Sequence, residues 1–111
     1  MKVKDMVENI NFHDSNVIEL LYENNIVKLK LDLCMWQQKY YKEGDSEQKE
    51  ILLVFNTVED YIWDSLKTEK DIDYDTILDM SYNDGIIKMI LLDGEVSIIT
   101  FKCNEVKIYL T

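Results

Sequence analysis

Alternation of apolar and polar residues is the clearest pattern in this chain. From Ile26 to about Met35, apolar side chains at every second position alternate with Lys28, Lys30 and Asp32. A period of two is typical of a β-strand with one buried face and one solvated face. The same alternation runs through residues 105–111. The pattern therefore predicts a chain that is mainly β.

Turn signals divide the C-terminal third into strands. Asp84-Gly85 and Asp93-Gly94 each stand between runs of large apolar residues, and Asp-Gly favours the two-residue type I′ turn of a β-hairpin. Cys103-Asn104 offers a weaker third turn, because Asn tolerates a positive φ. These turns predict an antiparallel meander of four strands at about residues 76–83, 86–92, 95–102 and 105–111.

The first part of the chain predicts a second hairpin, followed by a further strand. Its two strands cover residues 17–22 and about 26–35, with a turn at Asn24-Asn25, and the further strand covers 51–58. Residues 37–50 show no periodicity, so we expect a long loop or an extended hairpin tip there.

Two segments have apolar residues at helical spacing. Residues 1–10 are expected to form one or two helical turns, with Val3, Met6, Val7 and Ile10 on one side. For residues 59–70 we favour a short helix or turn, and a bent edge strand is the alternative.

These elements predict one domain over residues 1–111. We expect a single antiparallel sheet or meander, curved into a sandwich or half-barrel, with one or two short helical turns. An α+β fold is the alternative. A chain of this length buries about two thirds of its unfolded surface, which suffices for one hydrophobic core.

Composition bears on where the protein works. No apolar run approaches the roughly 18 residues that a membrane span needs, and Asp5 and Glu8 stand where a secretory signal would be apolar. The chain has no Ala, Arg or Pro, which is typical of an AT-rich bacterial genome. We therefore expect a bacterial, cytoplasmic protein, in which Cys34 and Cys103 are packing residues that remain thiols.

Negative charge is concentrated in one third of the sequence. The segment from Glu43 to Asp79 contains twelve of the 22 acidic residues and three of the 12 lysines, in a chain of net charge −10. Such a segment attracts basic surfaces and cations, and it disfavours contact with phosphates. We expect a basic protein surface as the partner, and neither nucleic acid nor membrane. A homo-oligomer held by exposed sheet edges is a further possibility.

Within this segment, Asp71, Asp73 and Asp75 alternate as do the first ligands of a calcium loop. The sixth position of such a loop requires Gly and the twelfth a bidentate Glu, but this chain has Thr76 and Tyr82 there. We therefore predict no metal site, and we interpret the three aspartates as a solvated loop or a charged edge strand.

His13 is the only histidine, which excludes sites that need two imidazoles from one chain. His13-Asp14-Ser15 has the residue types of a hydrolytic triad, yet three consecutive residues cannot stack in the order that such catalysis requires. We expect Asp14 or Ser15 to accept backbone N–H groups at the entry to the first strand, and His13 to lie against the sheet or donate to a carbonyl. No catalytic residue and no cofactor are predicted.

The motif Phe12-His13-Asp14-Ser15, followed by the apolar strand Val17–Leu20, resembles the opening of a group of small uncharacterised bacterial proteins. Some of these look like immunity proteins of toxin systems. A looser likeness extends to residues 54–58 and to the terminal meander. The resemblance implies an antiparallel β domain without known catalysis, and it assigns no catalytic residue.

Aromatic residues accompany the acidic ones, and Trp and Tyr serve equally as interface anchors and as cross-strand packing. We interpret the protein as a small non-enzymatic binding protein of the immunity or inhibitor type, which engages a basic partner through its acidic surface. The alternative is a small-ligand-binding protein or carboxylate-based enzyme with a pocket in the curved sheet. The candidate binding residues are Glu59, Asp60, Tyr61, Trp63 and Asp64.

Overall fold

The computed structural model describes residues 1–39, 42, 44, 46–64, 76–93 and 95–110. Their elements follow one another as α1 (Val3–Asn9), β1 (Asn16–Glu23), β2 (Ile26–Cys34), the 3-10 turn η1 (Met35–Gln37), β3 (Gln48–Phe55), β4 (Glu59–Asp64), β5 (Thr76–Asn83), β6 (Ile86–Asp93), β7 (Glu95–Lys102) and β8 (Val106–Leu110). The chain is mainly β, as the alternation predicted. In the described ranges, no helix has the length and apolar character to cross a membrane.

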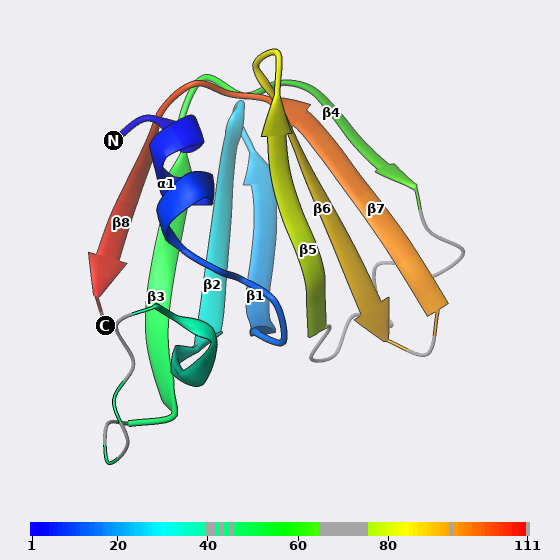
Figure 1. Cartoon of the computed structure of the whole chain (residues 1–111). Helices are drawn as coiled ribbons and strands as arrows, with labels where there is room; N and C mark the ends of the chain where they lie inside the picture. The colour runs from blue at the N-terminus through cyan, green and yellow to red at the C-terminus, as the bar shows by residue number, and fades with distance from the viewer. Residues whose placement is uncertain (40–41, 43, 45, 65–75, 94, 111) are drawn as a thin grey trace.

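The eight strands form one antiparallel sheet in the order β4-β7-β6-β5-β1-β2-β3-β8 (Figure 1). Two groups of four make up this order. In one group, β5, β6 and β7 pair as a meander that β4 extends. In the other group, β1, β2 and β3 pair in sequence and β8 extends them. Within the described ranges, the two groups join between β1 and β5 through one residue pair, Asn16 with Thr76.

The core lies on the face of the sheet where alternate residues point inward. In β2, for example, Val27, Leu29 and Leu31 are fully buried, while Lys28 is exposed. Helix α1 is too short to be stable alone, and it is held because Val3 and Met6 join the same buried cluster, as the helical spacing of residues 1–10 predicted.

The sheet is neither closed nor strongly curled, so the expected sandwich or half-barrel is not found. Its edges, β4 and β8, lie at opposite ends of the strand order. Figure 1 nevertheless shows the strands converging at the end where β3 leads to β4 and β7 leads to β8. There Phe55 of β3 meets Phe101 of β7 edge to face, with ring centroids 5.1 Å apart. The two halves therefore share one core at that end.

The predicted hairpin turns have the backbone that their residues favour. Asn24 and Asn25 both have positive φ, at 52° and 60°, and so do Asp84 and Gly85, at 52° and 81°. Positive φ at both central residues is the type I′ requirement. Around the other Asp-Gly pair, β6 and β7 remain paired as far as Asp93 and Glu95, and Gly94 lies outside the described residues. The antiparallel pairing of residues 86–92 with 95–102 is confirmed.

The third predicted turn is wrong. Cys103 and Asn104 do not connect neighbouring strands, because β8 pairs with β3 at the far edge rather than with β7. The chain instead crosses from one half of the sheet to the other. Val106 and Ile108, which gave β8 its alternating pattern, are matched with Phe55 and Leu53 of β3. Alternation defines a strand but not its neighbour.

The helix or turn favoured for residues 59–70 is also wrong for its first part. Residues 59–64 form edge strand β4, which was the alternative. Strand pairing gives these residues a period of two, because Trp63 lies opposite buried Ile99 while Ile62 lies opposite Thr100. Ile62 had contributed to the helical spacing but is exposed. Residues 65–75 lie outside the described part of the chain.

We predict that Gly85→Val lowers the free energy of unfolding by about 1 kcal/mol or more, because a β-branched residue is strained at positive φ. A Cβ at this position would meet only Asn104 Oδ1, at 3.8 Å, so the effect comes from the backbone and not from a clash. Urea unfolding measures it. Gly85→Asn, which tolerates positive φ, is the matched control, and equal losses for the two variants would contradict the prediction.

Candidate functional site

The candidate binding residues all lie on β4, the edge strand next to β7. The side chains of Glu59, Asp60 and Asp64 are exposed. Asp60 has a positive φ of 53° and lies where the pairing of β4 with β7 is irregular. Its carboxylate is 3.2 Å from Lys102 Nζ. A charged, irregular edge resists pairing with the sheet of another molecule. A partner would therefore meet the exposed carboxylates of β4 and not its backbone.

The two aromatic candidates face the core instead. Tyr61 stacks on Tyr22 of β1 with ring centroids 4.2 Å apart, and it also contacts Phe101. Trp63 is half-buried and packs against the core cluster, and its Nε1 is buried with no hydrogen-bond partner among the described residues. Tyr61 therefore connects β4 to the opposite half of the sheet. Both rings act in packing, which was one of the two roles expected for them.

An exposed apolar residue takes the central position on β4. Ile62 is 59% exposed and lies between the carboxylates of Asp60 and Asp64 in sequence. Sequence analysis missed Ile62 because the assumed helical spacing turned it toward the core. Trp36 of η1 is also exposed, at 54%. The acidic edge surface is defined here as Glu59, Asp60, Ile62 and Asp64.

The remainder of the acidic segment is only partly described. The calcium-like residues Asp71, Asp73 and Asp75 lie outside the described residues. Across the ranges that the structure does describe, no three His, Cys, Asp or Glu side chains are grouped so that they can hold a metal ion.

A polar hollow of about 550 Å³ adjoins the start of β4 at the converging end of the sheet. The β3–β4 and β7–β8 connections and the Asp84-Gly85 turn form its walls. Three carboxylates, from Glu59, Asp84 and Glu105, line it together with Lys102 and Asn104. Asn104 Oδ1 accepts a hydrogen bond from the Tyr82 hydroxyl at 3.1 Å. The hollow lies between loops and not in the curve of the sheet.

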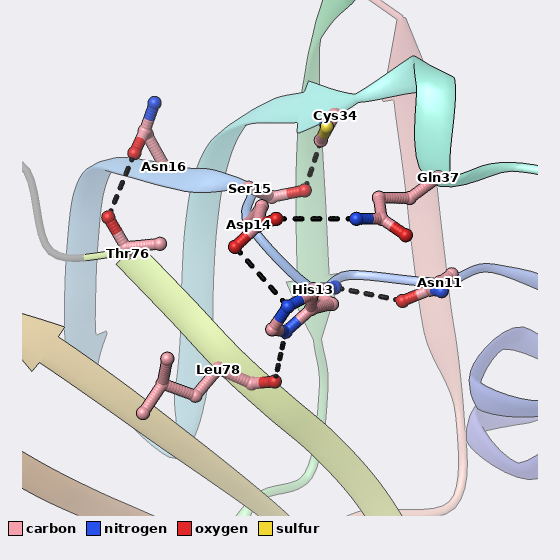
Figure 2. A network of polar contacts seen from close by, with 9 residues as sticks. All are labelled: Asn11, His13, Asp14, Ser15, Asn16, Cys34, Gln37, Thr76 and Leu78. Carbon is pink, nitrogen blue, oxygen red and sulfur yellow. Dashed lines mark hydrogen bonds and ion pairs between the residues drawn. The ribbon is translucent and has the colours of Figure 1, made fainter.

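The Phe12-His13-Asp14-Ser15 motif lies at the junction of the two halves (Figure 2). The backbone N–H of Asp14 donates to the Ile77 carbonyl at 2.9 Å, and the N–H of Ile77 donates to the Ser15 carbonyl at 2.8 Å. The Thr76 hydroxyl lies 3.2 Å from Asn16 Oδ1. Asp14 makes this turn with a positive φ of 66°. Phe12 is buried in the core.

The three polar side chains of the motif reach three different segments of the chain. The Cys34 N–H donates to Ser15 Oγ at 2.9 Å, and Gln37 Nε2 donates to Asp14 Oδ2 at 3.3 Å. His13 Nδ1 is 2.8 Å from the Leu78 carbonyl oxygen. Its Nε2 lies 3.3 Å from Asp14 Oδ1. The sequence predicted that Ser15 accepts a backbone N–H and that His13 lies against the sheet or a carbonyl. Both contacts are confirmed.

This arrangement differs from a hydrolytic triad. Ser15 is fully buried and its oxygen faces the backbone of β2, whereas the His13 ring is half exposed and faces β5. A nucleophile must lie within hydrogen-bond reach of its base and of substrate. The described contacts of the motif instead connect β1 with β2 and β5.

Gln38 completes the junction from a segment that was expected to be a loop. Its side chain is buried, its Oε1 accepts from the Asn11 N–H at 3.0 Å, and its Nε2 donates to the carbonyls of Asn11 and Cys34 at 2.6 and 2.9 Å. Sequence analysis missed Gln38. Its amide bonds to the backbone of Asn11, which is 27 residues away in the sequence, and such a contact leaves no pattern among neighbouring residues.

Searches for similar proteins among family models, curated proteins and solved structures found no match.

We predict that Ser15→Ala lowers the free energy of unfolding by about 1–3 kcal/mol, because it leaves the buried Cys34 N–H without its acceptor. Ser46→Ala removes an exposed serine hydroxyl that donates to the Gln48 carbonyl, and as a control it should change stability by about 0.5 kcal/mol or less. Urea unfolding of both variants provides the measurement. Equal stabilities would mean that the junction does not depend on Ser15.

Burial raises the pKa values of the Cys34 and Cys103 thiols above their ordinary value of 9.0. The stabilisation that follows from a raised pKa is complete below the pKa of the unfolded thiol, and it is lost as the pH rises through the folded value. We predict that the free energy of unfolding falls above about pH 9, and that it falls less steeply in Cys34→Ala/Cys103→Ala. Urea unfolding across this pH range measures both slopes, and identical slopes would contradict the prediction.

Proposed function

We propose that the protein is a non-enzymatic binding protein of the immunity or inhibitor type, which engages a basic protein surface through its acidic edge surface. One observation carries this proposal. On β4, exposed carboxylates flank the exposed Ile62, while Tyr61 and Trp63 fasten the strand to the core. An apolar centre with a charged rim on a fixed backbone is the arrangement of many protein interfaces.

The charge of the chain supports the same partner chemistry. A net charge of −10 repels acidic partners and speeds encounter with basic ones. An inhibitor of this kind works by covering a basic site, such as one that binds phosphates, with fixed carboxylates. The likeness of the Phe12–Ser15 opening to immunity proteins agrees with this proposal but assigns no binding residue.

A small-ligand-binding or carboxylate-based catalytic role is the second candidate, and the polar hollow favours it. Glu59, Asp84 and Glu105 bring carboxylates to one space, and Lys102 adds a cation. Screening of amines and polyols by thermal shift tests this role. A compound whose stabilising effect disappears in Glu105→Gln would support a site in the hollow.

The binding proposal predicts that Glu59→Gln/Asp60→Asn/Asp64→Asn weakens the complex with the basic partner, mainly by slowing association, because neutral amides no longer steer the encounter. Any basic protein encoded next to this gene serves as a probe, and its binding is measured by calorimetry and by stopped-flow association at several salt concentrations. The affinity of the wild-type protein should fall as salt rises.

The matched control is Asp5→Asn/Glu8→Gln/Glu23→Gln, which removes the same charge from exposed positions on α1 and β1. It should leave most of the affinity intact. Trp63→Ala should lower the stability of the fold, since the ring packs against the core. A complex that tolerates the β4 variant as well as the control, and that ignores salt, would refute the acidic edge surface as the binding site.

A further inference from the structure

The outer face of the β4-β7-β6-β5 half carries a group of aliphatic side chains. Strand register places Ile98 opposite Ile90 and Val96 opposite Leu92 on the adjacent strands β7 and β6. These four residues alternate with buried ones and therefore point outward. Two further isoleucines, on β4 and at the start of β6, lie on the same side. The aliphatic face is defined here as Ile62, Ile86, Ile90, Leu92, Val96 and Ile98.

Within the described ranges, no element covers this face. Ile62 and Val96 are 59% and 54% exposed, and helix α1 packs its buried residues into the core on the inner side. The outer face of the other half is different, because charged groups such as Lys30 and Glu50 lie side by side there. Extended aliphatic patches are uncommon on monomeric proteins and mark interaction sites.

Carboxylates flank the aliphatic face on both sides. Asp64 of β4 lies opposite Ile98, and Asp79 of β5 lies opposite Ile90, so one cross-strand row has an apolar pair between two acids. Neither aspartate has an ion-pair partner among the residues that the structure describes. The described charged groups on this side of the four strands are four carboxylates and two lysines, namely Glu59, Asp60, Asp64, Asp79, Lys88 and Lys102. The flanks of the aliphatic face are therefore acidic.

A hollow of about 360 Å³ opens at one end of the aliphatic face. Its lining comes from β4, β6 and β7 and consists of Asp60, Ile62, Ile86, Thr100, Phe101 and Lys102. One large apolar side chain of a partner fits such a space. Anchors of this kind carry much of the affinity of protein interfaces.

The strand pairing beneath the aliphatic face decides which kind of segment can dock there. Strands β6 and β7 are each paired on both sides, so they offer side chains and no free backbone groups. Three strand spacings, or about 14 Å, separate β4 from β5, and an α-helix with its side chains is about 10–12 Å wide. A helix along β6 and β7 therefore covers the aliphatic rows and brings the residues on its two flanks to Asp64 and Asp79.

We infer that the aliphatic face docks an amphipathic helix of the basic partner, in which an apolar stripe is flanked by lysines or arginines. The stripe packs on β6 and β7, one of its side chains enters the hollow beside Ile62, and its basic flanks meet Asp64 and Asp79. This inference rests on the proposed function, since the aliphatic face continues the acidic edge surface and shares Ile62 with it. A second copy is disfavoured as the occupant, because two chains of net charge −10 repel each other.

A synthetic peptide tests the inference. The probe is a peptide of about five helical turns, with leucines in one stripe and lysines on both sides of the stripe. A peptide of the same composition in shuffled order, which has no stripe, is the comparison. Calorimetry with the full chain should show that the striped peptide binds about tenfold or more tightly than the shuffled one.

Two variants examine the two parts of the contact. Leu92→Thr/Val96→Thr removes apolar surface but keeps β-branched residues, which favour strands, and it should weaken binding of the striped peptide by about tenfold or more, which is roughly 1.4 kcal/mol. Asp64→Asn/Asp79→Asn should weaken the binding and also reduce its dependence on salt.

The controls make matched changes elsewhere. Leu21→Thr/Leu110→Thr removes two exposed leucines from the other half of the sheet, and it should bind the striped peptide as the wild type does. Asp5→Asn/Glu8→Gln, on α1, does the same for charge. Far-UV circular dichroism and thermal melting report whether each variant is folded. If Leu92→Thr/Val96→Thr is unfolded, Val96→Thr alone should weaken binding in the same direction.

Equal binding of the striped and shuffled peptides would overturn the inference. So would a control that weakens binding as much as Leu92→Thr/Val96→Thr. A wild-type chain that ignores the peptide but forms a dimer sensitive to Leu92→Thr/Val96→Thr in sedimentation velocity would assign the aliphatic face to a second copy, and this result would also overturn the inference.

Measurements with the basic protein partner separate this inference from the proposed function. Full affinity of Leu92→Thr/Val96→Thr, together with loss of affinity in Glu59→Gln/Asp60→Asn, would overturn the helix site and leave the acidic edge surface in place. The reverse pattern would support the helix site and refute the acidic edge surface.

Discussion

The fold depends on the junction between β1 and β5. Each half of the sheet has three strands that are consecutive in the chain, extended by one strand that crosses from the other half, and each has its own apolar inner face. Among the described residues, one pair continues the ladder from one half to the other. The hydrogen bonds around Asp14, Ser15 and Ile77 therefore set how the halves meet. A short motif has this effect because it bonds to backbone groups of both halves, at Cys34 and at Ile77.

The junction works together with the packing at the converging end. A series of ring contacts runs across the sheet. Tyr22 of β1 stacks on Tyr61 of β4, Tyr61 contacts Phe101 of β7, and Phe101 contacts Phe55 of β3. These contacts connect strands that lie far apart in the sheet order. The sheet is thus restrained in two ways, by hydrogen bonds at Asn16 and Thr76 and by ring contacts between the halves. These restraints allow one core to form without barrel closure.

Charge acts differently on the two outer surfaces. On β4 the carboxylates lie beside an exposed isoleucine at an edge, where they oppose unwanted strand pairing. On the outer face of β1, β2 and β3, lysines and carboxylates lie side by side, because Lys30 shares this face with Glu19 and Glu50 and lies 3.7 Å from Glu50 Oε1. Because both surfaces rest on paired strands, their charges are held at defined positions. The net charge of −10 describes only the sum and does not reveal this arrangement.

Sequence alone determined the local elements of this protein. Alternation and the turns at Asn24-Asn25 and Asp84-Gly85 defined the hairpins, because the period of two and the preference for positive φ are properties of neighbouring residues. It also indicated the carboxylates of β4 and the polar contacts of His13 and Ser15. Tertiary structure decided which strands became neighbours across the sheet. The placement of β8 beside β3, the strand at residues 59–64, the burial of Gln38 and the exposure of Ile62 all depend on contacts between distant segments. Such contacts are chosen by shape and by the pairing of buried polar groups, which leave no periodic trace along the chain.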